Sequence, residues 1–269
     1  MNRIQKCFER TRAEGRPAFI AYLTMGYPNL AASEDAADTL LANGADILEL
    51  GVPFSDPVAD GAVIRTAAYA ALAQGVTLAD ILALAGRLRT KHPDAPLVVF
   101  SYYNVIYSYG LEKFAADAEA AGVDAVLSVD LPLEERDELL EVLRPHGLTF
   151  VPLIAPTTSL ERTIEAAKGL EDSFLYVITV KGTTGARAEL PPELKERLAT
   201  IRAAVNMPIA AGFGISTKEQ VKVIGEVADG FIVGSAFVKM LAKDGKIHPE
   251  ELSFLSSRCD SLGRPLTGA

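Results

Sequence analysis

The chain has 269 residues, of which 49% are hydrophobic, and its 26 basic and 35 acidic side chains give a formal net charge of −9. This length is typical of one closed α/β barrel, so we expect a single domain over residues 1–269. The negative charge and the lack of any Lys/Arg block argue against a nucleic-acid partner, because a phosphate backbone requires a concentrated basic face.

The N-terminal residues 1–16 are rich in charged side chains and have no apolar stretch, which predicts a short amphipathic helix and excludes a secretory signal. No run of about 18 apolar residues occurs, so a membrane-spanning helix is not expected. Cys7 and Cys259 lie far apart without neighbouring histidines, which predicts neither a disulfide framework nor a zinc site. These features indicate a soluble, cytoplasmic protein without a metal.

Short apolar runs, each followed by a longer segment with helical spacing of its apolar residues, recur along the chain, as in parallel βα units. The runs are almost continuously hydrophobic, which fits parallel strands that are covered on both faces. The expected strands are residues 18–25, 46–50, 97–102, 125–129, 148–153, 174–180, 208–211 and 230–233. The expected helices are residues 29–42, 63–74, 78–91, 111–121, 134–144, 160–168, 192–204 and 217–226.

Eight such units predict an α/β fold, a single (β/α)8 TIM barrel with an extra N-terminal helix. The second unit has two helical segments, residues 63–74 and 78–91, so it contains one additional helix. Thr77 and Ser159 precede expected helices and are suited to cap them. A doubly wound open sheet is the alternative, but it usually has fewer strands and an early glycine-rich phosphate turn, which this sequence lacks.

Glu49 is an acidic residue inside the otherwise apolar second strand. A carboxylate in such a place is costly unless it is paired, hydrogen-bonded or protonated. One interpretation is a structural ion pair with a neighbouring strand. The other is a catalytic carboxyl whose raised pKa suits it to exchange protons near neutral pH.

The loop that follows this strand, residues 53–61, adds Asp56 and Asp60 and is stiffened by two prolines. Asp60 could form an Asx-turn or cap a helix, and Asp56 could be structural. Two carboxylates in different surroundings, however, tend to have different pKa values and can act as separate acid and base. Loops at the carboxyl ends of barrel strands also form the active site of this fold.

Glycine-bearing segments follow the last two strands, where barrels often bind phosphate through backbone N–H groups. They are residues 211–215, with the letters AGFGI, and the pair Gly234 and Ser235. Glycine lets the backbone approach an anion, and a serine adds a hydroxyl donor. Glycine can also serve merely to turn the chain, but two such segments at adjacent barrel corners predict a phosphate site.

Two further segments stand where strands end. Residues 181–188 form a small-residue loop after the sixth strand, which could be a surface loop or a lid that closes over substrate. Residues 100–104, FSYYN, form an aromatic cluster that either packs in the core or contacts a flat apolar substrate.

With these motifs identified, the chain strongly resembles the α subunits of tryptophan synthase. The resemblance rests on motifs that occur in the family's order over nearly the whole chain. They are TMGYP at 24–28, LELGVPFSDPVADG at 48–61, YYN at 102–104, DLP at 130–132, APTT at 155–158, GTTGAR at 182–187, GFGI at 212–215 and GSA at 234–236.

The resemblance implies a carbon–carbon lyase that cleaves indole-3-glycerol phosphate to indole and D-glyceraldehyde 3-phosphate. It assigns proton transfer to Glu49 and stabilisation of the indole nitrogen to Asp60. The phosphate donors would be Gly185, Gly214, Gly234 and Ser235. The substrate contacts would be Tyr22, Phe100, Tyr102, Leu127, Ile154, Tyr176, Thr184 and Phe213, with Thr184 ordering against Asp60 on closure.

The family also implies a partner, the β subunit of tryptophan synthase, in an αββα heterotetramer that passes indole internally to make tryptophan. Pyridoxal phosphate is expected in that partner, and no cofactor is expected in this chain. Residues 53–60 would contact the β subunit. Ala62, Arg65 and Thr183 depart from the family's usual Pro, Gln and Val, and they leave both carboxylates untouched.

Three other functions remain as alternatives. The chain could be a lyase that works without a β partner, a regulatory subunit that has lost its own chemistry, or a different phosphosugar isomerase on the same barrel. Intact Glu49 and Asp60 argue against the regulatory subunit.

Overall fold

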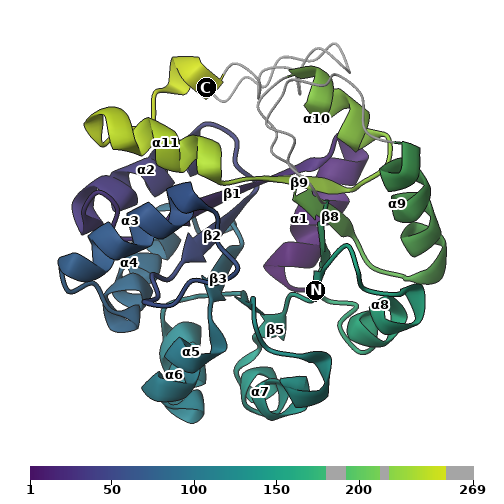
Figure 1. Ribbon diagram of the computed structural model, residues 1–269, viewed down its shortest axis with the longest axis horizontal. Helices are drawn as coiled ribbons and strands as arrows, with labels where there is room; N and C mark the ends of the chain where they lie inside the picture. The colour runs from purple at the N-terminus through teal and green to yellow at the C-terminus, as the bar shows by residue number, and fades with distance from the viewer. Residues whose placement is uncertain (180–191, 213–217, 253–269) are drawn as a thin grey trace.

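The computed structural model describes residues 1–179, 192–212 and 218–252, and it consists of a central parallel sheet surrounded by helices (Figure 1). The strands are β1 (Ala18–Thr24), β2 (Ile47–Gly51), β3 (Leu97–Ser101), β4 (Ala125–Ser128), β5 (Thr149–Phe150), β6 (Leu153–Ile154), β7 (Leu175–Ile178), β8 (Ile209–Gly212) and β9 (Gly230–Val233). The helices are α1 (Arg3–Ala13), α2 (Leu30–Ala42), α3 (Ala62–Ala73), α4 (Leu78–Lys91), α5 (Tyr103–Tyr109), α6 (Leu111–Ala120), α7 (Arg136–Leu143), α8 (Leu160–Ala167), α9 (Pro192–Ala204), α10 (Lys218–Gly225) and α11 (Ser235–Asp244). Short 3-10 turns are η1 (Leu133–Glu135), η2 (Arg144–His146) and η3 (Pro249–Leu252).

The sheet closes into a barrel. Its strand order is β5-β4-β3-β2-β1-β9-β8-β7-β6, and the two edge strands are consecutive in the chain. Between them, the Val151 N–H donates to the Val126 carbonyl over 2.8 Å, and the Pro152 carbonyl accepts from Tyr176 over 3.0 Å. The single strand expected at residues 148–153 is therefore divided at Pro152, which has no N–H to donate. The predicted (β/α)8 barrel is confirmed, with β5 and β6 as two parts of one barrel strand.

Two apolar layers hold the barrel together. The larger cluster lies between the strands and the surrounding helices, and the smaller one fills the barrel with alternate strand residues such as Ile20, Val98 and Leu127. Side chains from α1, namely Ile4 and Phe8, belong to the inner cluster. The N-terminal helix, which was expected from the charge pattern, thus plugs the barrel.

Three aspartates tie neighbouring strands together at the end of the barrel where the strands begin. Each directly precedes a strand and accepts a hydrogen bond from a backbone N–H of the adjacent strand. The carboxylates of Asp46, Asp124 and Asp229 accept from Phe19, Leu97 and Ile209 over 2.8, 2.8 and 2.9 Å. A hydrogen bond to a carboxylate is among the stronger ones in proteins because its acceptor is charged, so these links brace the barrel base.

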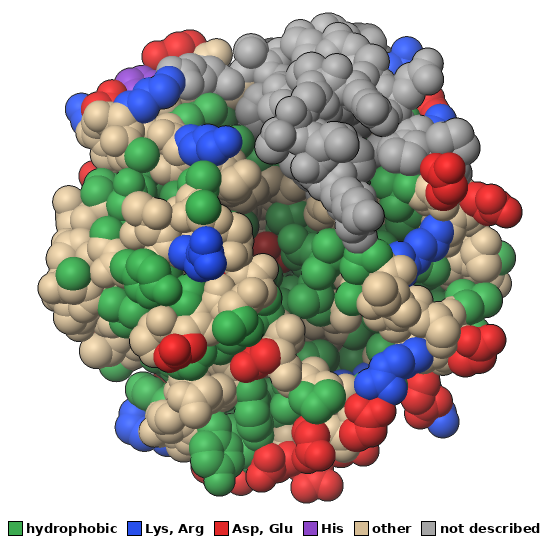
Figure 2. Space-filling view, in the orientation of Figure 1, with side chains coloured by type: hydrophobic (Ala, Val, Ile, Leu, Met, Phe, Trp, Pro, Cys, Tyr) green, Lys and Arg blue, Asp and Glu red, His purple; other side chains and the backbone are tan. Residues whose placement is uncertain are grey.

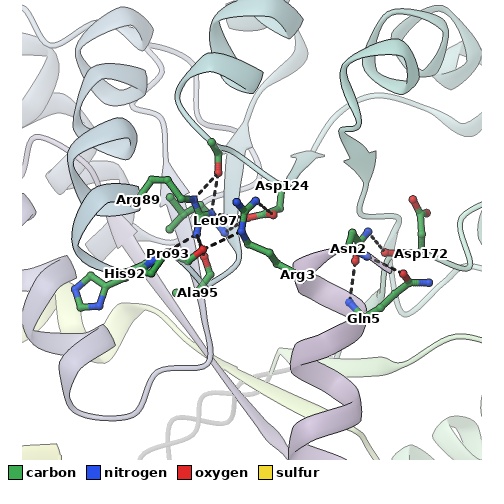
Figure 3. Close-up of polar contacts among 11 residues, drawn as sticks. Asn2, Arg3, Gln5, Arg89, His92, Pro93, Ala95, Leu97, Asp124 and Asp172 are labelled. Atoms are coloured by element: carbon green, nitrogen blue, oxygen red, sulfur yellow. Dashed lines mark hydrogen bonds and ion pairs between the residues drawn. The ribbon is translucent and has the colours of Figure 1, made fainter.

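Arginines of α1 pair with the same three carboxylates. Arg10 contacts Asp46 at 2.9 Å, and Arg12 contacts Asp229 at 3.8 Å. Figure 3 shows Arg3 reaching Asp124 at 2.9 Å beside Arg89, whose Nη2 lies 2.7 Å from the same carboxylate. The helix is therefore fixed by charge as well as by apolar packing.

Local sequence signals account for some helix starts, because side chains cap α1, α2, α4 and α8. Thr77 and Asp80 form a capping box at α4, and the Ser159 side chain caps α8. Helix α5 was not expected, because its seven residues are mostly aromatic or β-branched and give no helical period. The start of this helix is held by a distant residue, since the Tyr103 N–H donates to Asp130 Oδ1 over 2.7 Å. Within the described ranges, no single helix is long and apolar enough to cross a membrane, although α3 and α4, bent by 101°, pass that test as a pair.

Candidate active site

Glu49 lies on the inner face of β2, in register with Tyr22 of β1 and Val98 of β3. Its side chain is fully buried, and neither carboxylate oxygen has a hydrogen-bond partner among the residues that the structure describes. Burial alone raises the pKa of Glu49 to about 8. The structural ion pair, considered above as an alternative, is not formed within the described part of the chain, and the carboxyl can take or release a proton near neutral pH.

Asp60 lies in the loop between β2 and α3 and is half-buried. The Tyr102 hydroxyl donates to Asp60 Oδ2 over 3.2 Å. Burial raises the pKa of Asp60, whereas the hydrogen bond from Tyr102 and the charge of Arg65 act to lower it. Asp60 is not a helix cap, because the N-cap of α3 is Gly61 and no side-chain hydrogen bond caps this helix. Asp56 is exposed and bonds locally to Ser55, so it does not join Asp60.

Tyr102 connects this loop to the neighbouring barrel unit. It directly follows β3, is almost fully buried, and its hydroxyl accepts the Ala59 N–H over 3.0 Å. Its ring packs on Phe54 with the centroids 4.9 Å apart. The loop that presents Asp60 is therefore held by a side chain from the next strand and not only by its own prolines.

Two buried tyrosines share the electrostatic surroundings of both carboxylates. Burial raises the pKa of Tyr22, and the negative charges of Asp60 and Glu49 raise it further. The pKa of Tyr176 is raised by burial and then by the same two carboxylates. The structure thus brings four of the predicted residues to one region, although they come from different strands and a loop.

A cavity of about 190 Å³ opens beside these residues, near the carboxyl ends of the strands. Figure 2 shows a hollow in the centre of this face, with apolar side chains around it and an acidic side chain within it. The cavity is lined by Tyr22, Ile64, Phe100, Tyr176, Gly212, Ile232, Val233, Gly234, Ser235 and Ala236. A larger one, of about 630 Å³ between α2 and α11, is lined by none of the predicted site residues. The smaller cavity is the candidate site because it is lined by Tyr22 and Tyr176, the two tyrosines that lie within the electrostatic reach of Glu49 and Asp60.

Glycines at the strand ends make room for the two tyrosines. A Cβ atom on Gly51 would lie 2.4 Å from the Tyr22 hydroxyl oxygen, and one on Gly212 would lie 2.7 Å from Tyr176 Cε1. Neither distance is tolerable for non-bonded atoms, so these positions exclude other residues unless the rings move. Gly212 belongs to the glycine-rich segment expected to approach phosphate, and here it serves to seat an aromatic ring.

Helix α11 begins at the edge of the cavity. Its N-cap is Gly234, no side chain bonds to the cap, and Ser235 is exposed at its first position. Free backbone N–H groups and the helix dipole make such an end attractive to an anion. The arrangement suits the phosphate group predicted for this corner of the barrel.

The remaining predicted residues are distributed differently. Leu127 packs inside the barrel, but Ile154 packs in the outer cluster, and its neighbour Leu153 faces inward with Tyr176. Leu153 is therefore better placed than Ile154 to reach the site. Thr184, Gly185, Phe213 and Gly214, together with the proposed lid at residues 181–188, lie outside the described residues.

Several cavity residues were missed from the sequence. Strand alternation could have identified Ile232, which precedes Gly234 by two positions. Ile64, in the first turn of α3, carries no such signal in the sequence. Within the described ranges, no group of three His, Cys, Asp or Glu side chains is arranged to hold a metal ion.

Comparisons with known proteins agree with one another. A family model described as tryptophan synthase alpha chain matches residues 8–262. A tryptophan synthase alpha chain from Geobacter sulfurreducens is 42% identical over 265 residues, which cover 98% of this chain and 100% of the relative, and one from Thermoanaerobacter is 40% identical over 262 residues, covering 96% and 98%. The crystal structure of a Legionella pneumophila tryptophan synthase alpha chain matches with a TM-score of 0.85 at 34% identity over 98% of both chains. A chain of a tryptophan synthase from M. tuberculosis matches with a TM-score of 0.83 at 32% identity, covering 98% of this chain and 100% of that one.

Proposed function

The chain belongs to the tryptophan synthase alpha chain family and is a lyase, and from this premise we propose that it cleaves indole-3-glycerol phosphate to indole and D-glyceraldehyde 3-phosphate. The observation that carries the proposal is the state of Glu49. Its carboxyl is fully buried, has no hydrogen-bond partner among the described residues, and has a pKa of about 8, close to neutral pH. A general acid and base works best with such a pKa.

The proposed reaction divides between the two carboxylates. Protonated Glu49 gives its proton to C3 of the indole ring, which makes the ring an electron sink, and Asp60 accepts the ring N–H and stabilises the positive charge. Glu49, now ionised, removes the proton of the side-chain hydroxyl. The carbon–carbon bond then breaks, its electrons return to the ring, and the hydroxyl-bearing carbon becomes an aldehyde.

The cavity supports the substrate class. Its walls near the carboxylates are aromatic, with Phe100 and Tyr176 available for a flat ring, and its edge is the N-terminal end of α11 with Ser235. An apolar wall and an anion-binding end match a substrate with an indole at one end and a phosphate at the other. The roles predicted for Thr184, Gly185, Phe213 and Gly214 belong to the same proposal.

The chemistry needs only proton transfer and charge stabilisation, so we propose no cofactor for this chain and assign pyridoxal phosphate to the β partner. We also propose the cytoplasm as its location, in keeping with the family to which the chain belongs. The buried thiol of Cys7 is unreactive, since burial raises its pKa to about 12.

The β subunit is proposed to bind at the loop of residues 53–60, in an αββα assembly. Val58 in this loop is 86% exposed, and Tyr107 on α5 is 59% exposed. The loop and α5 adjoin, because Tyr102 stacks on Phe54 and directly precedes α5. Exposed apolar side chains on adjoining segments favour a protein partner.

The test is indole formation from indole-3-glycerol phosphate, measured with and without a β subunit. Glu49→Gln keeps the shape of the side chain and removes proton transfer, so we expect a loss of about 10²–10⁴-fold in kcat. Asp60→Asn should lose activity as well, and Glu141→Gln, on the exposed face of α7, should keep it. Activity of Glu49→Gln within about tenfold of the wild type would refute the assignment, and an unstimulated but active chain would favour a lyase that works alone.

A further inference from the structure

Tyr22 presents a hydroxyl group inside the candidate site that the proposed reaction has not yet used. The residue is opposite Glu49 in the strand register and is only 6% exposed. Its hydroxyl oxygen lies over Gly51, at 2.4 Å from the position that a Cβ atom there would take. Because Gly51 is two residues beyond Glu49 on the same face of β2, the hydroxyl stands one step closer than Glu49 to the carboxyl ends of the strands.

The ring of Tyr22 is held firmly, whereas its hydroxyl is held weakly. Phe100 packs against the ring edge-to-face, with centroids 5.1 Å apart and an interplanar angle of 74°. The hydroxyl oxygen lies 3.4 Å from Thr24 Oγ1, and either oxygen could be the donor. This distance is long for a bond between hydroxyl groups, so the Tyr22 hydroxyl hydrogen is available for a better acceptor.

Tyr22 also lies between the two ends expected of the substrate. The ring contacts the start of α11, since a Cβ atom on Gly234 would come within 3.0 Å of Tyr22 Cδ1. Its neighbour on the other side is Glu49. A chain of carbon atoms that joins an indole at the carboxylates to a phosphate at α11 must therefore pass this side chain.

The surroundings keep the hydroxyl protonated. Burial and the nearby charges of Asp60 and Glu49 raise the pKa of Tyr22 above its ordinary value. At neutral pH the group is therefore a hydrogen-bond donor and not a base.

We propose that Tyr22 is a further catalytic residue, whose hydroxyl donates a hydrogen bond to the oxygen of the substrate's side-chain hydroxyl while Glu49 removes the proton from that oxygen. The inference rests on the proposed cleavage reaction. Tyr22 keeps its own proton throughout. The substrate O–H bond breaks, its proton goes to Glu49, the carbon–carbon bond breaks, and the oxygen forms the C=O of the aldehyde. A fixed donor stabilises the negative charge that develops on this oxygen during the step.

The decisive variant is Tyr22→Phe, which retains the ring and its contact with Phe100 and removes only the hydroxyl. For one hydrogen bond to an atom that gains charge, we expect kcat to fall by about tenfold to a hundredfold. The KM for indole-3-glycerol phosphate should stay within about threefold, because the interaction strengthens only in the transition state. The dissociation constant of indole, which has no side-chain hydroxyl, should not change.

Two controls separate this role from a structural one. Tyr69→Phe makes the same change on the exposed face of α3 and should leave the kinetics unchanged. Thr24→Val removes the other hydroxyl of the pair and should keep kcat within about threefold of the wild type.

Each other outcome has a definite meaning. If the wild type cleaves indole-3-glycerol phosphate and Tyr22→Phe has the same kcat, the inference is overturned and the proposed function is left intact. Equal losses in Tyr22→Phe and Thr24→Val, or weaker indole binding in Tyr22→Phe, overturn it in favour of a structural hydroxyl pair. A wild-type chain that does not cleave indole-3-glycerol phosphate, even with a β subunit, overturns the proposed function and this inference with it.

Discussion

The Tyr102 hydroxyl donates a hydrogen bond to Asp60 Oδ2 over 3.2 Å and accepts the Ala59 N–H over 3.0 Å. A residue that follows β3 thereby fixes a carboxylate that follows β2. The position and the charge of Asp60 depend on this contact between neighbouring barrel units, and not on the loop alone.

Tyr102→Phe should raise the pKa of Asp60, because the lost hydrogen bond is one of the two interactions that lower it. The ionised form of Asp60 would then predominate only at higher pH. We expect the acid limb of the pH profile of kcat/KM to move upward, with values on that limb lowered by roughly fivefold, equivalent to about 1 kcal/mol. Steady-state kinetics as a function of pH measure both effects, and an acid limb that stays in place in the Tyr102→Phe variant would contradict this role.

The free energy of unfolding should depend on the protonation of Glu49. Its pKa is about 8 in the folded chain against 4.5 for the ordinary carboxyl, so the folded state holds the proton more tightly. The stabilising contribution is fully present below about pH 4.5 and is lost as the pH rises towards 8, by at most about 1.4 kcal/mol per pH unit.

Glu49→Gln has no such proton to lose. Between pH 5 and about pH 8, its stability relative to wild type should therefore increase steadily in urea titrations. Glu141→Gln is the matched control and should show a constant difference. A constant difference for Glu49→Gln as well would mean that the Glu49 pKa is not raised.

Asp124→Asn should weaken the barrel base. The buried carboxylate accepts the Leu97 N–H and pairs with Arg3 and Arg89, so its neutralisation leaves Arg89, which is 14% exposed, without its charged partner. Loss of one partner of a largely buried pair costs about 3 kcal/mol. Urea unfolding measures the loss, with Asp35→Asn on the exposed face of α2 as a control expected within about 0.5 kcal/mol of wild type. Because Asp124 is remote from the cavity, kcat of the folded variant should not change.

Gly51→Ala should displace the Tyr22 ring. The added methyl group would lie 2.4 Å from the hydroxyl oxygen and 2.5 Å from Cζ, and relief of such overpacking costs about 1–3 kcal/mol. We expect lower stability and a loss of indole formation of tenfold or more, on the order of the same free energy. Gly86→Ala, on α4 with its nearest neighbour at 3.9 Å, should instead be neutral or stabilising and fully active. Full activity in Gly51→Ala would show that the exact place of Tyr22 does not matter.

Much of this protein could be predicted from the sequence because its signals are local. Eight apolar runs and the capping residue Thr77 fixed the barrel class and the bounds of helix α4. Glu49 could be identified because a carboxyl in an apolar strand is unusual in itself. The interrupted strand at Pro152 and the aromatic helix α5 were not expected, since one depends on closure of the barrel and the other on its packing against helices α4 and α6.

By itself, the sequence determined which residues carry charge and which strand or loop holds each of them. Only the tertiary structure decided what surrounds them. Burial raises the pKa of Glu49, which has no partner among the described residues. Tyr102 reaches Asp60 from the next strand, and Tyr22 lies over Gly51 near both carboxylates. The physical reason is that a pKa and a hydrogen bond depend on distance and desolvation. Residues far apart in the chain acquire these only when the barrel closes.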